Sequence, residues 1–191
     1  MKRKEAIETI MTTIEPCDVV VSTTGLISRE IFEKFDSDRN IYVTGSMGLS
    51  SSIGLGLAVS LTNKMVVVID GDASVLMNLG SIVTIGNKRP KNLLHIVIDN
   101  SAYGSCSEEE SMSGSANLDR LTTDVGYRYI QIVSSQEDLK YAIMMFRKGP
   151  GFILAKIELG GRRDFKRPLN LVEIKNRFML FLTPTVRGEQ L

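Results

Sequence analysis

Three runs of aliphatic residues restrict the possible fold of this chain more than any other feature. They are KMVVVID (64–70), LLHIVID (93–99) and FILAKIE (152–158), and in none of them do apolar and polar residues alternate. A strand of this kind is buried on both faces, which is typical of a parallel sheet covered by helices on each side. Two further runs, CDVVVST (17–23) and NIYVTG (40–45), predict two more strands of the same sheet.

Helical patterns lie between and after these strands. The small residues of 49–62 predict a helix that packs very closely on the sheet, and Asn170 with Glu173 resembles a capping box that opens a helix over about 170–182. The other predicted helices cover 28–35, 73–86 and 135–147, and a long loop is expected over 101–118. Alternating strands and helices predict an α/β fold with a three-layer, doubly wound, mostly parallel sheet.

The composition is that of an ordinary soluble domain. A length of 191 residues predicts one domain over 1–191, and a net charge of +1 gives no reason to expect a nucleic-acid or membrane surface. Two cysteines without metal-type spacing and an N-terminus without the apolar core of a signal peptide favour a reduced, cytoplasmic protein. The single histidine, His95, lies within a predicted strand and is interpreted as a packed core residue.

Two of the predicted strands end in polar residues that suit a cation and a phosphate group. Asp70-Gly71-Asp72 ends one strand, and Asp99-Asn100 ends the next. Ligands of open parallel sheets bind beyond the carboxyl ends of the strands, so these side chains are expected to share one edge. Because Mg²⁺ takes oxygen ligands and commonly bridges a carboxylate to phosphates, Asp72 and Asn100 are candidate ligands of a Mg²⁺–diphosphate group.

Neighbouring residues extend this hypothesis, and simpler alternatives exist. A helix that starts at Ala73 and Ser74 would present N–H groups to the same anion, and the Ala102 carbonyl could complete the cation's ligands. Each motif alone is more typical of an ordinary helix cap or turn, and only their combination favours a ligand site. A dinucleotide-binding loop is the weakest alternative, because the glycines at 45, 48, 54 and 56 do not fit G-x-G-x-x-G.

The paired motifs resemble the cofactor motif of thiamine-diphosphate enzymes, in which Gly-Asp-Gly and Asn-Asn stand at a similar spacing. This chain has GDA (71–73) and DN (99–100), so alanine replaces the last glycine and aspartate the first asparagine. The resemblance implies that thiamine diphosphate and Mg²⁺ are the cofactors. It also implies that Asp72, Asn100 and the carbonyl of Ala102 bind the Mg²⁺.

A second stretch, VTGSMGLSSSIGLGLA (43–58), looks like the family segment that holds the cofactor in a bent conformation. The resemblance implies that Met47 props the cofactor, that the Gly45 carbonyl accepts a hydrogen bond from the aminopyrimidine, and that STTG (22–25) lines the diphosphate end. The cofactor-binding residues implied in this way are Thr24, Gly25, Gly45, Ser46, Met47, Gly71, Asp72, Ala73, Ser74, Asn100, Ala102, Tyr103 and Gly104.

The similarity is more specific to one group of these enzymes. STTGLISRE, GSMG, GDASVLMNLGSIVTIG, PKNLLHIVIDNSAYGS and RRDFKRP resemble the phosphonopyruvate and sulfopyruvate decarboxylases, over most of 18–182. The resemblance implies the diphosphate-binding domain of a lyase that acts on a 2-oxo acid with a distal anion. It favours 3-sulfopyruvate, converted to sulfoacetaldehyde and CO₂ as in coenzyme M biosynthesis, with phosphonopyruvate as the alternative. CSEEESMSG (106–114) replaces a Thr-Gly-Gly-Gln-like stretch and leaves the substrate open.

The resemblance accounts for only one of the two domain types that these enzymes use. The activating glutamate belongs to an aminopyrimidine-binding domain, for which 191 residues leave no room. An α-type partner subunit in a hetero-oligomer is therefore implied, and no catalytic residue is assigned to this chain. An acetolactate-synthase-like subunit and a non-catalytic cofactor-binding module are the alternatives.

Several other residues near these motifs have plain interpretations. Tyr103 packs over the cofactor or only anchors the loop, and Cys106 is interpreted as a small loop residue. The acidic run 108–110 is expected to be solvated. The basic cluster of 162–167 is expected to be an exposed tail or a subunit contact rather than a substrate contact.

Overall fold

The computed structural model describes residues 1–106 and 108–183, whose strands form a single six-stranded sheet. All pairs are parallel, in the order β2-β1-β3-β4-β6-β5. The strands are β1 (Val19–Ser22), β2 (Asn40–Tyr42), β3 (Val66–Gly71), β4 (Leu93–Asp99), β5 (Tyr129–Val133) and β6 (Gly151–Lys156). The predicted parallel sheet is confirmed, and β5 is an additional strand that the apolar runs did not reveal.

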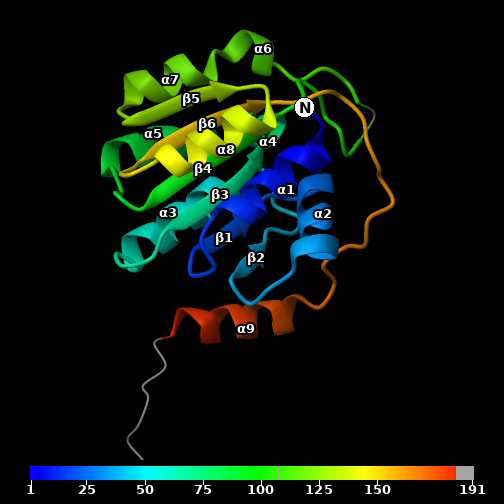
Figure 1. The fold of residues 1–191 in the computed structure, drawn as a ribbon, viewed down its shortest axis with the longest axis vertical. Coiled ribbons are helices and arrows are strands. Elements are labelled where there is room, and N and C mark those ends of the chain that lie inside the picture. The colour runs from blue at the N-terminus through cyan, green and yellow to red at the C-terminus, as the bar shows by residue number, and fades with distance from the viewer. Residues whose placement is uncertain (107, 184–191) are drawn as a thin grey trace, which may run out of the picture.

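Helices cover both faces of the sheet, as Figure 1 shows. On one face lie α1 (Arg3–Thr13), α2 (Leu26–Phe35) and α8 (Gln136–Met145); on the other lie α3 (Ser50–Ser60), α4 (Asp72–Met77), α5 (Leu79–Lys88) and α7 (Leu118–Val125). The strands alternate between two apolar cores, so Val67 and Ile69 face the first layer while Val66 and Val68 face the second. The predicted three-layer, doubly wound α/β fold is therefore confirmed.

The chain changes direction between β1 and β3, and this change opens a crevice at their carboxyl ends. After β1 the chain enters α2 on one face and then reaches β2, whereas after β3 it enters α4 on the other face and then reaches β4. Loops that leave adjacent strands toward opposite faces separate from each other. Such a switch point is where open parallel sheets bind ligands.

Two predicted segments differ in detail from the structure. The single helix expected over 73–86 is divided into α4 and α5 at Asn78, whose backbone (φ −145°, ψ 58°) leaves the helical region. The expected loop over 101–118 contains the short helix α6 (Ser113–Ala116) and a bridge between Ala102 and Glu110. Most of this region nevertheless lacks regular structure, as its Ser and Gly content predicts.

The last helix covers the β2 edge of the sheet. α9 (Leu171–Leu182) begins after Asn170, whose side chain accepts a hydrogen bond from the backbone N–H of Glu173. This is one of the two bonds of the predicted capping box; the Glu173 carboxylate accepts from the Asn170 side-chain amide instead of the backbone N–H. Ile174 and Phe178 are its buried residues, and Figure 1 shows the helix beside β2. The expected domain extends to 191, but 184–191 lie outside the described residues. Within 1–106 and 108–183, no helix combines the length and apolarity needed to cross a bilayer.

Candidate functional site

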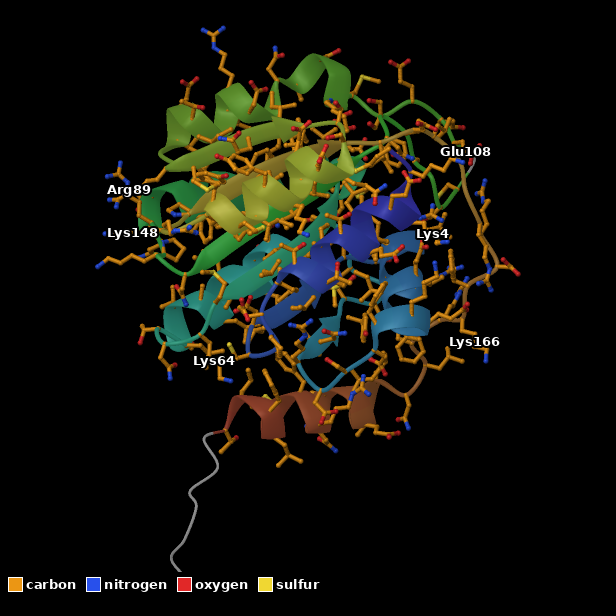
Figure 2. The ribbon with its side chains drawn as sticks, in the orientation of Figure 1. Lys4, Lys64, Arg89, Glu108, Lys148 and Lys166 are labelled. Carbon is orange, nitrogen blue, oxygen red and sulfur yellow. The ribbon has the colours of Figure 1, made fainter. Side chains whose placement is uncertain are left out.

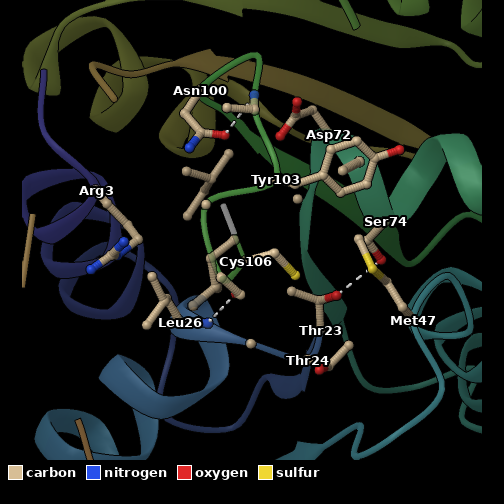
Figure 3. Close-up of a pocket in the computed structure, with 18 of the residues that line it drawn as sticks. Arg3, Thr23, Thr24, Leu26, Met47, Asp72, Ser74, Asn100, Tyr103 and Cys106 are labelled. Atoms are coloured by element: carbon tan, nitrogen blue, oxygen red, sulfur yellow. Dashed lines mark hydrogen bonds between the residues drawn. The ribbon is translucent and has the colours of Figure 1, made fainter. Parts of the chain in front are cut away.

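A cavity of about 220 Å³ opens at the carboxyl ends of the strands, at the crevice beside β1, β3 and β4. Its walls come from the residues after β1, the segment before α3, the start of α4 and the loop after β4, as Figure 3 shows. The side chains that line it are mostly small or apolar, with hydroxyl, amide and carboxylate groups gathered where the strands end. The strand-end motifs of the sequence therefore share one edge, as predicted.

The carboxylate of Asp72 is buried at this cavity, with 2% of the residue exposed. Its described polar side-chain partner is the hydroxyl of Ser111, which donates a hydrogen bond to Oδ2. Burial raises the pKa of this carboxyl, the charge of Asp99 raises it further, and the bond from Ser111 opposes both effects. A buried carboxylate in this state favours binding of a cation.

The two neighbouring strand-end carboxylates have polar or basic side chains beside them within the chain. Asp99 accepts hydrogen bonds from Lys156 on β6 and from the Ser113 hydroxyl, 2.9 Å away. Asp70 accepts from Ser50 Oγ at 2.6 Å and has His95 Nε2 at 3.4 Å. Burial opposes the ionisation of Asp70, but His95 and the hydroxyl bonds outweigh it and lower the pKa of this carboxyl.

Among the described residues, then, Asp72 is the strand-end carboxylate with no basic side chain within ion-pair distance. Asn100 lies on the same cavity, where its Oδ1 accepts a hydrogen bond of 3.3 Å from the N–H of Ala102. The carbonyl of Ala102 accepts from the N–H of Gly104 at 2.9 Å. A carboxylate, an amide oxygen and a carbonyl oxygen are the ligand types that Mg²⁺ takes, so these residues fit a magnesium ion.

A different kind of metal site has no support in the described ranges 1–106 and 108–183. They contain no group of three His, Cys, Asp or Glu side chains that could hold a metal ion. A site here would depend on Asp72 together with neutral oxygen atoms, and it would leave several positions for ligand oxygens. Mg²⁺ commonly binds in this way when it bridges protein and phosphate.

Hydroxyl groups connect three separate segments beside the carboxylate. Ser74 Oγ accepts a hydrogen bond from Thr23 Oγ1 at 3.0 Å and another from the N–H of Gly48 at 3.1 Å. The segment after β1, the segment before α3 and the start of α4 therefore meet at one atom, and Met47 lies beside them on the cavity (Figure 3). The hydroxyl groups of Thr23 and Ser74 therefore lie next to the apolar side chain of Met47.

The turn after β1 requires a glycine for two reasons. Gly25 has a φ of +83°, which L side chains rarely adopt, and a Cβ at this position would lie 2.4 Å from Ser105 Oγ. Ser105 Oγ accepts a hydrogen bond from the N–H of Leu26 at 3.2 Å. The start of α2 is therefore held directly against the loop that follows β4, and this contact closes one side of the cavity.

The basic side chains of the 162–167 cluster are exposed, as expected, and two of them also pair within the chain, while a subunit contact stays a prediction. Arg162 pairs with Glu33 at 2.6 Å, and Arg163 donates to the carbonyl of Cys106 at 2.6 Å and to Glu108 at 3.1 Å. Glu108 is therefore paired, rather than only solvated as expected. In Figure 2 it lies at the end of the molecule opposite Lys64 and Lys148.

The structure brings most of the predicted site residues onto this cavity. Its lining includes Thr24, Gly25, Met47, Gly71, Asp72, Ala73, Ser74, Asn100, Ala102, Tyr103 and Gly104. Gly45 and Ser46 are exposed next to Met47 and do not line the cavity, because their segment turns toward solvent there. Their contact with a cofactor stays a prediction, as do the individual roles of the residues that line the cavity.

Sequence reasoning missed several residues of the site. Arg3, Leu26, Ile27, Ser105, Cys106 and Ile157 also line the cavity, and Ser111 contacts Asp72. Arg3 and Ile157 belong to segments with no motif, so only the folded chain reveals them. Ser111 had a detectable signal, because it lies in the Ser- and Gly-rich stretch that was expected to be a functional loop.

Comparison with known proteins gives a consistent result. The family model for the C-terminal TPP binding domain of thiamine pyrophosphate enzymes matches residues 29–157; thiamine pyrophosphate is a synonym of thiamine diphosphate. Sulfopyruvate decarboxylase subunit beta of Methanococcus maripaludis is 39% identical over 94% of this chain and 96% of its own length. The corresponding subunit of Methanocaldococcus jannaschii is 44% identical over 71% of this chain and 72% of its own length.

Longer proteins match as well. Phosphonopyruvate decarboxylase of Streptomyces viridochromogenes is 35% identical over 97% of this chain, and the chain spans 47% of that relative's length. Among solved structures, a putative thiamin diphosphate-dependent enzyme from Mycobacterium smegmatis has a TM-score of 0.65 and 17% identity, over 84% of this chain and 32% of the other. The structural likeness supports the fold alone.

Proposed function

Because this chain belongs to the thiamine pyrophosphate enzyme family, among its sulfopyruvate and phosphonopyruvate decarboxylases, we propose that it is the cofactor-binding subunit of a 2-oxo acid decarboxylase. The observation that carries the proposal is the uncompensated carboxylate of Asp72, buried at a cavity that also exposes Asn100. The substrate that we propose is 3-sulfopyruvate. Relatives named for this activity include one that the chain matches over 96% of its length.

The residues of the cavity have separate tasks in this proposal. Asp72, Asn100 and the Ala102 carbonyl hold Mg²⁺, and the hydroxyls of Thr24 and Ser74 bind the diphosphate. When bound, thiamine diphosphate supplies a carbanion that adds to the keto carbon and accepts the electrons released with CO₂. Met47, which is 39% exposed, holds the cofactor's reactive part in place and excludes water from that side.

An α-type subunit supplies the remaining groups in this proposal. Among the residues described, the cavity offers Asp72 as its acidic side chain, and we assign that residue to the cation. A glutamate that activates the cofactor must then come from another domain. The name "subunit beta" of the relatives with similar length supports a separate partner chain.

Cofactor binding is tested with the two cysteines, both of which are exposed. Cys106 lines the cavity, whereas Cys17 lies in the turn between α1 and β1 and does not. Alkylation of each thiol is followed by peptide mass spectrometry, with and without thiamine diphosphate and Mg²⁺. We expect the cofactor to slow alkylation of Cys106 severalfold and to leave Cys17 unchanged, and Asp72→Ala to abolish the protection. Equal rates at Cys106 in all conditions would refute a cofactor site here.

The activity is tested on the chain co-expressed with an α-type partner. The assembled enzyme is given 3-sulfopyruvate, phosphonopyruvate and pyruvate, and CO₂ and aldehyde are measured. We expect 3-sulfopyruvate to react fastest, pyruvate to react poorly because it lacks the distal anion, and the single chain to be inactive. A product that joins two acids would favour the acetolactate-synthase-like alternative. Cofactor binding without turnover of any acid would favour the non-catalytic module.

A further inference from the structure

A second buried carboxylate immediately precedes Gly71, which lines the cavity, and is not used in the proposed chemistry. Asp70 is 0% exposed and does not line the cavity. Its Oδ2 accepts a hydrogen bond of 2.6 Å from Ser50 Oγ and lies 3.4 Å from His95 Nε2. Its Oδ1 accepts a hydrogen bond of 2.9 Å from the N–H of Gly71. A buried carboxylate is costly unless its oxygens are bonded, so the residues around it are constrained by it.

The partners of Asp70 belong to opposite walls of the cavity. Gly71 precedes Asp72, the candidate metal ligand, in the strand-to-helix turn. Ser50 is the first residue of α3 and follows the segment that carries Met47. One oxygen of Asp70 therefore bonds to the turn that holds the candidate metal ligand. The other oxygen bonds to the first residue of α3, at the opposite wall.

Additional bonds hold the same segment to the same elements. The N–H of Gly48 donates to Ser74 Oγ on α4, and its carbonyl accepts from Asn78 Nδ2 at 3.1 Å. The Met47 side chain, by contrast, makes no hydrogen bond among the described residues and is 39% exposed. Its place on the cavity therefore depends on how its neighbours Gly48 and Ser50 are fixed.

We propose that Asp70 is a positioning residue that sets the separation between the Met47 wall and the metal-binding turn, acting through the hydroxyl of Ser50. The inference rests on the proposed cofactor site for its functional meaning. Asp70 touches neither cofactor nor substrate in this role. It determines instead whether Met47 and Asp72 face the same ligand at the distance that the ligand requires.

The next residue of α3 provides a matched control. Ser51 is also 1% exposed, and its Oγ lies 2.6 Å from Ser81 Oγ, but this bond joins α3 to α5 and not to the strand end. Ser50→Ala and Ser51→Ala each remove one hydroxyl and one buried hydrogen bond from the same helix. A purely structural role predicts that neither variant changes cofactor binding as long as the chain stays folded.

Two measurements on the full chain separate the variants. The first is the dissociation constant of thiamine diphosphate in saturating Mg²⁺. We expect Ser50→Ala to raise it by about tenfold, because binding must then order the released Met47 segment again; this factor corresponds to about 1.4 kcal/mol. Ser51→Ala should change it by less than about twofold. The second is hydrogen–deuterium exchange of 45–49 without cofactor, which should become faster in Ser50→Ala alone. Asp70→Asn, which keeps one acceptor and gains a donor, should fall between Ser50→Ala and the wild type in both.

Each outcome has a definite meaning. Equal effects of the two serine variants on binding would overturn the positioning role, even if exchange at 45–49 differs. Equal exchange would show that Ser50 does not hold the segment and would overturn the inference directly. If the wild-type chain fails to bind the cofactor, the proposed function is refuted, and the exchange comparison still decides whether Asp70 holds this wall.

Discussion

The close approach of α3 to the sheet leads to a prediction about two glycines of one helix. Gly54 faces β3, and a Cβ built on it would lie 2.2 Å from Cγ2 of Val68, whereas a Cβ on Gly56 would meet nothing within 4 Å. Ideal carbon–carbon contacts are about 3.5–4.0 Å, so alanine at 54 overlaps Val68 by more than an ångström. Val68 is fully buried and cannot turn away into solvent.

The magnitudes follow from two opposing contributions. Alanine within a helix is favoured over glycine by about 0.8–1 kcal/mol, and this gain applies to both positions. Overpacking a core costs about 1–3 kcal/mol, and this penalty applies only to Gly54→Ala. We therefore expect Gly56→Ala to raise the free energy of unfolding by about 1 kcal/mol and Gly54→Ala to lower it by up to about 2 kcal/mol. At about 2–4 °C per kcal/mol for a chain of this size, the two Tm values should differ by several degrees.

Thermal and urea unfolding of both variants measure this difference, and a third variant identifies its cause. Val68→Ala removes the methyl group that Gly54→Ala would strike, so in this background Gly54→Ala should become as favourable as Gly56→Ala. The same stability for Gly54→Ala and Gly56→Ala, or the same penalty for Gly54→Ala with and without Val68, would refute the close packing of α3 on β3. A displaced α3 should also weaken cofactor binding, since this helix follows the Met47 segment.

Three further predictions concern the charged groups of the site. Because burial raises the pKa of Asp72, ionisation of this carboxyl lowers the stability of the cation-free fold. This loss of stability is absent below the pKa that Asp72 has in the unfolded chain and is complete above its pKa in the folded chain. Asp72→Asn should therefore abolish Mg²⁺-dependent cofactor binding in calorimetry and, at pH 7, melt no lower than the wild type. Lys156→Met should lower the free energy of unfolding by about 2 kcal/mol in urea denaturation, because it leaves the buried Asp99 without its basic partner. Adding Asp99→Asn should restore most of the loss. Arg163→Ala removes a half-exposed ion pair, so Tm should change little, while alkylation of Cys106 should become faster.

Much of the fold was predictable because strands that are buried on both faces have a recognisable sequence pattern. β3, β4 and β6 are buried on both faces, so their residues are apolar without alternation. β5 was missed because it is an edge strand whose Gln131 and Ile132 are exposed, which makes its sequence resemble a surface segment. The division of 73–86 was missed because it depends on Asn78, whose side-chain amide donates a hydrogen bond to the carbonyl of Gly48 in a distant segment.

The site was predictable where a residue able to bind a ligand directly follows a buried strand. Asp72 and Asn100 follow buried strands directly, and parallel strands bring such residues together whatever lies between them. Contacts between remote segments left no comparable signal. The bonds of Arg163 to the loop after β4 and of Ser111 to Asp72 depend on how irregular segments fold back, which no periodicity encodes.

The pairing of Asp99 with Lys156 restricts the order in which this sequence could have diverged. The two residues lie opposite each other in the register of β4 and β6. Aspartate stands here in place of the first asparagine of the motif that this stretch resembles. An ancestor with asparagine could acquire the lysine at little cost, since that side chain is 40% exposed. An ancestor that acquired the aspartate first would carry a buried charge without a basic partner. The lysine is therefore expected to have arisen before the aspartate. Among relatives, lysine at 156 with asparagine at 99 should be far more frequent than aspartate at 99 without a basic residue at 156.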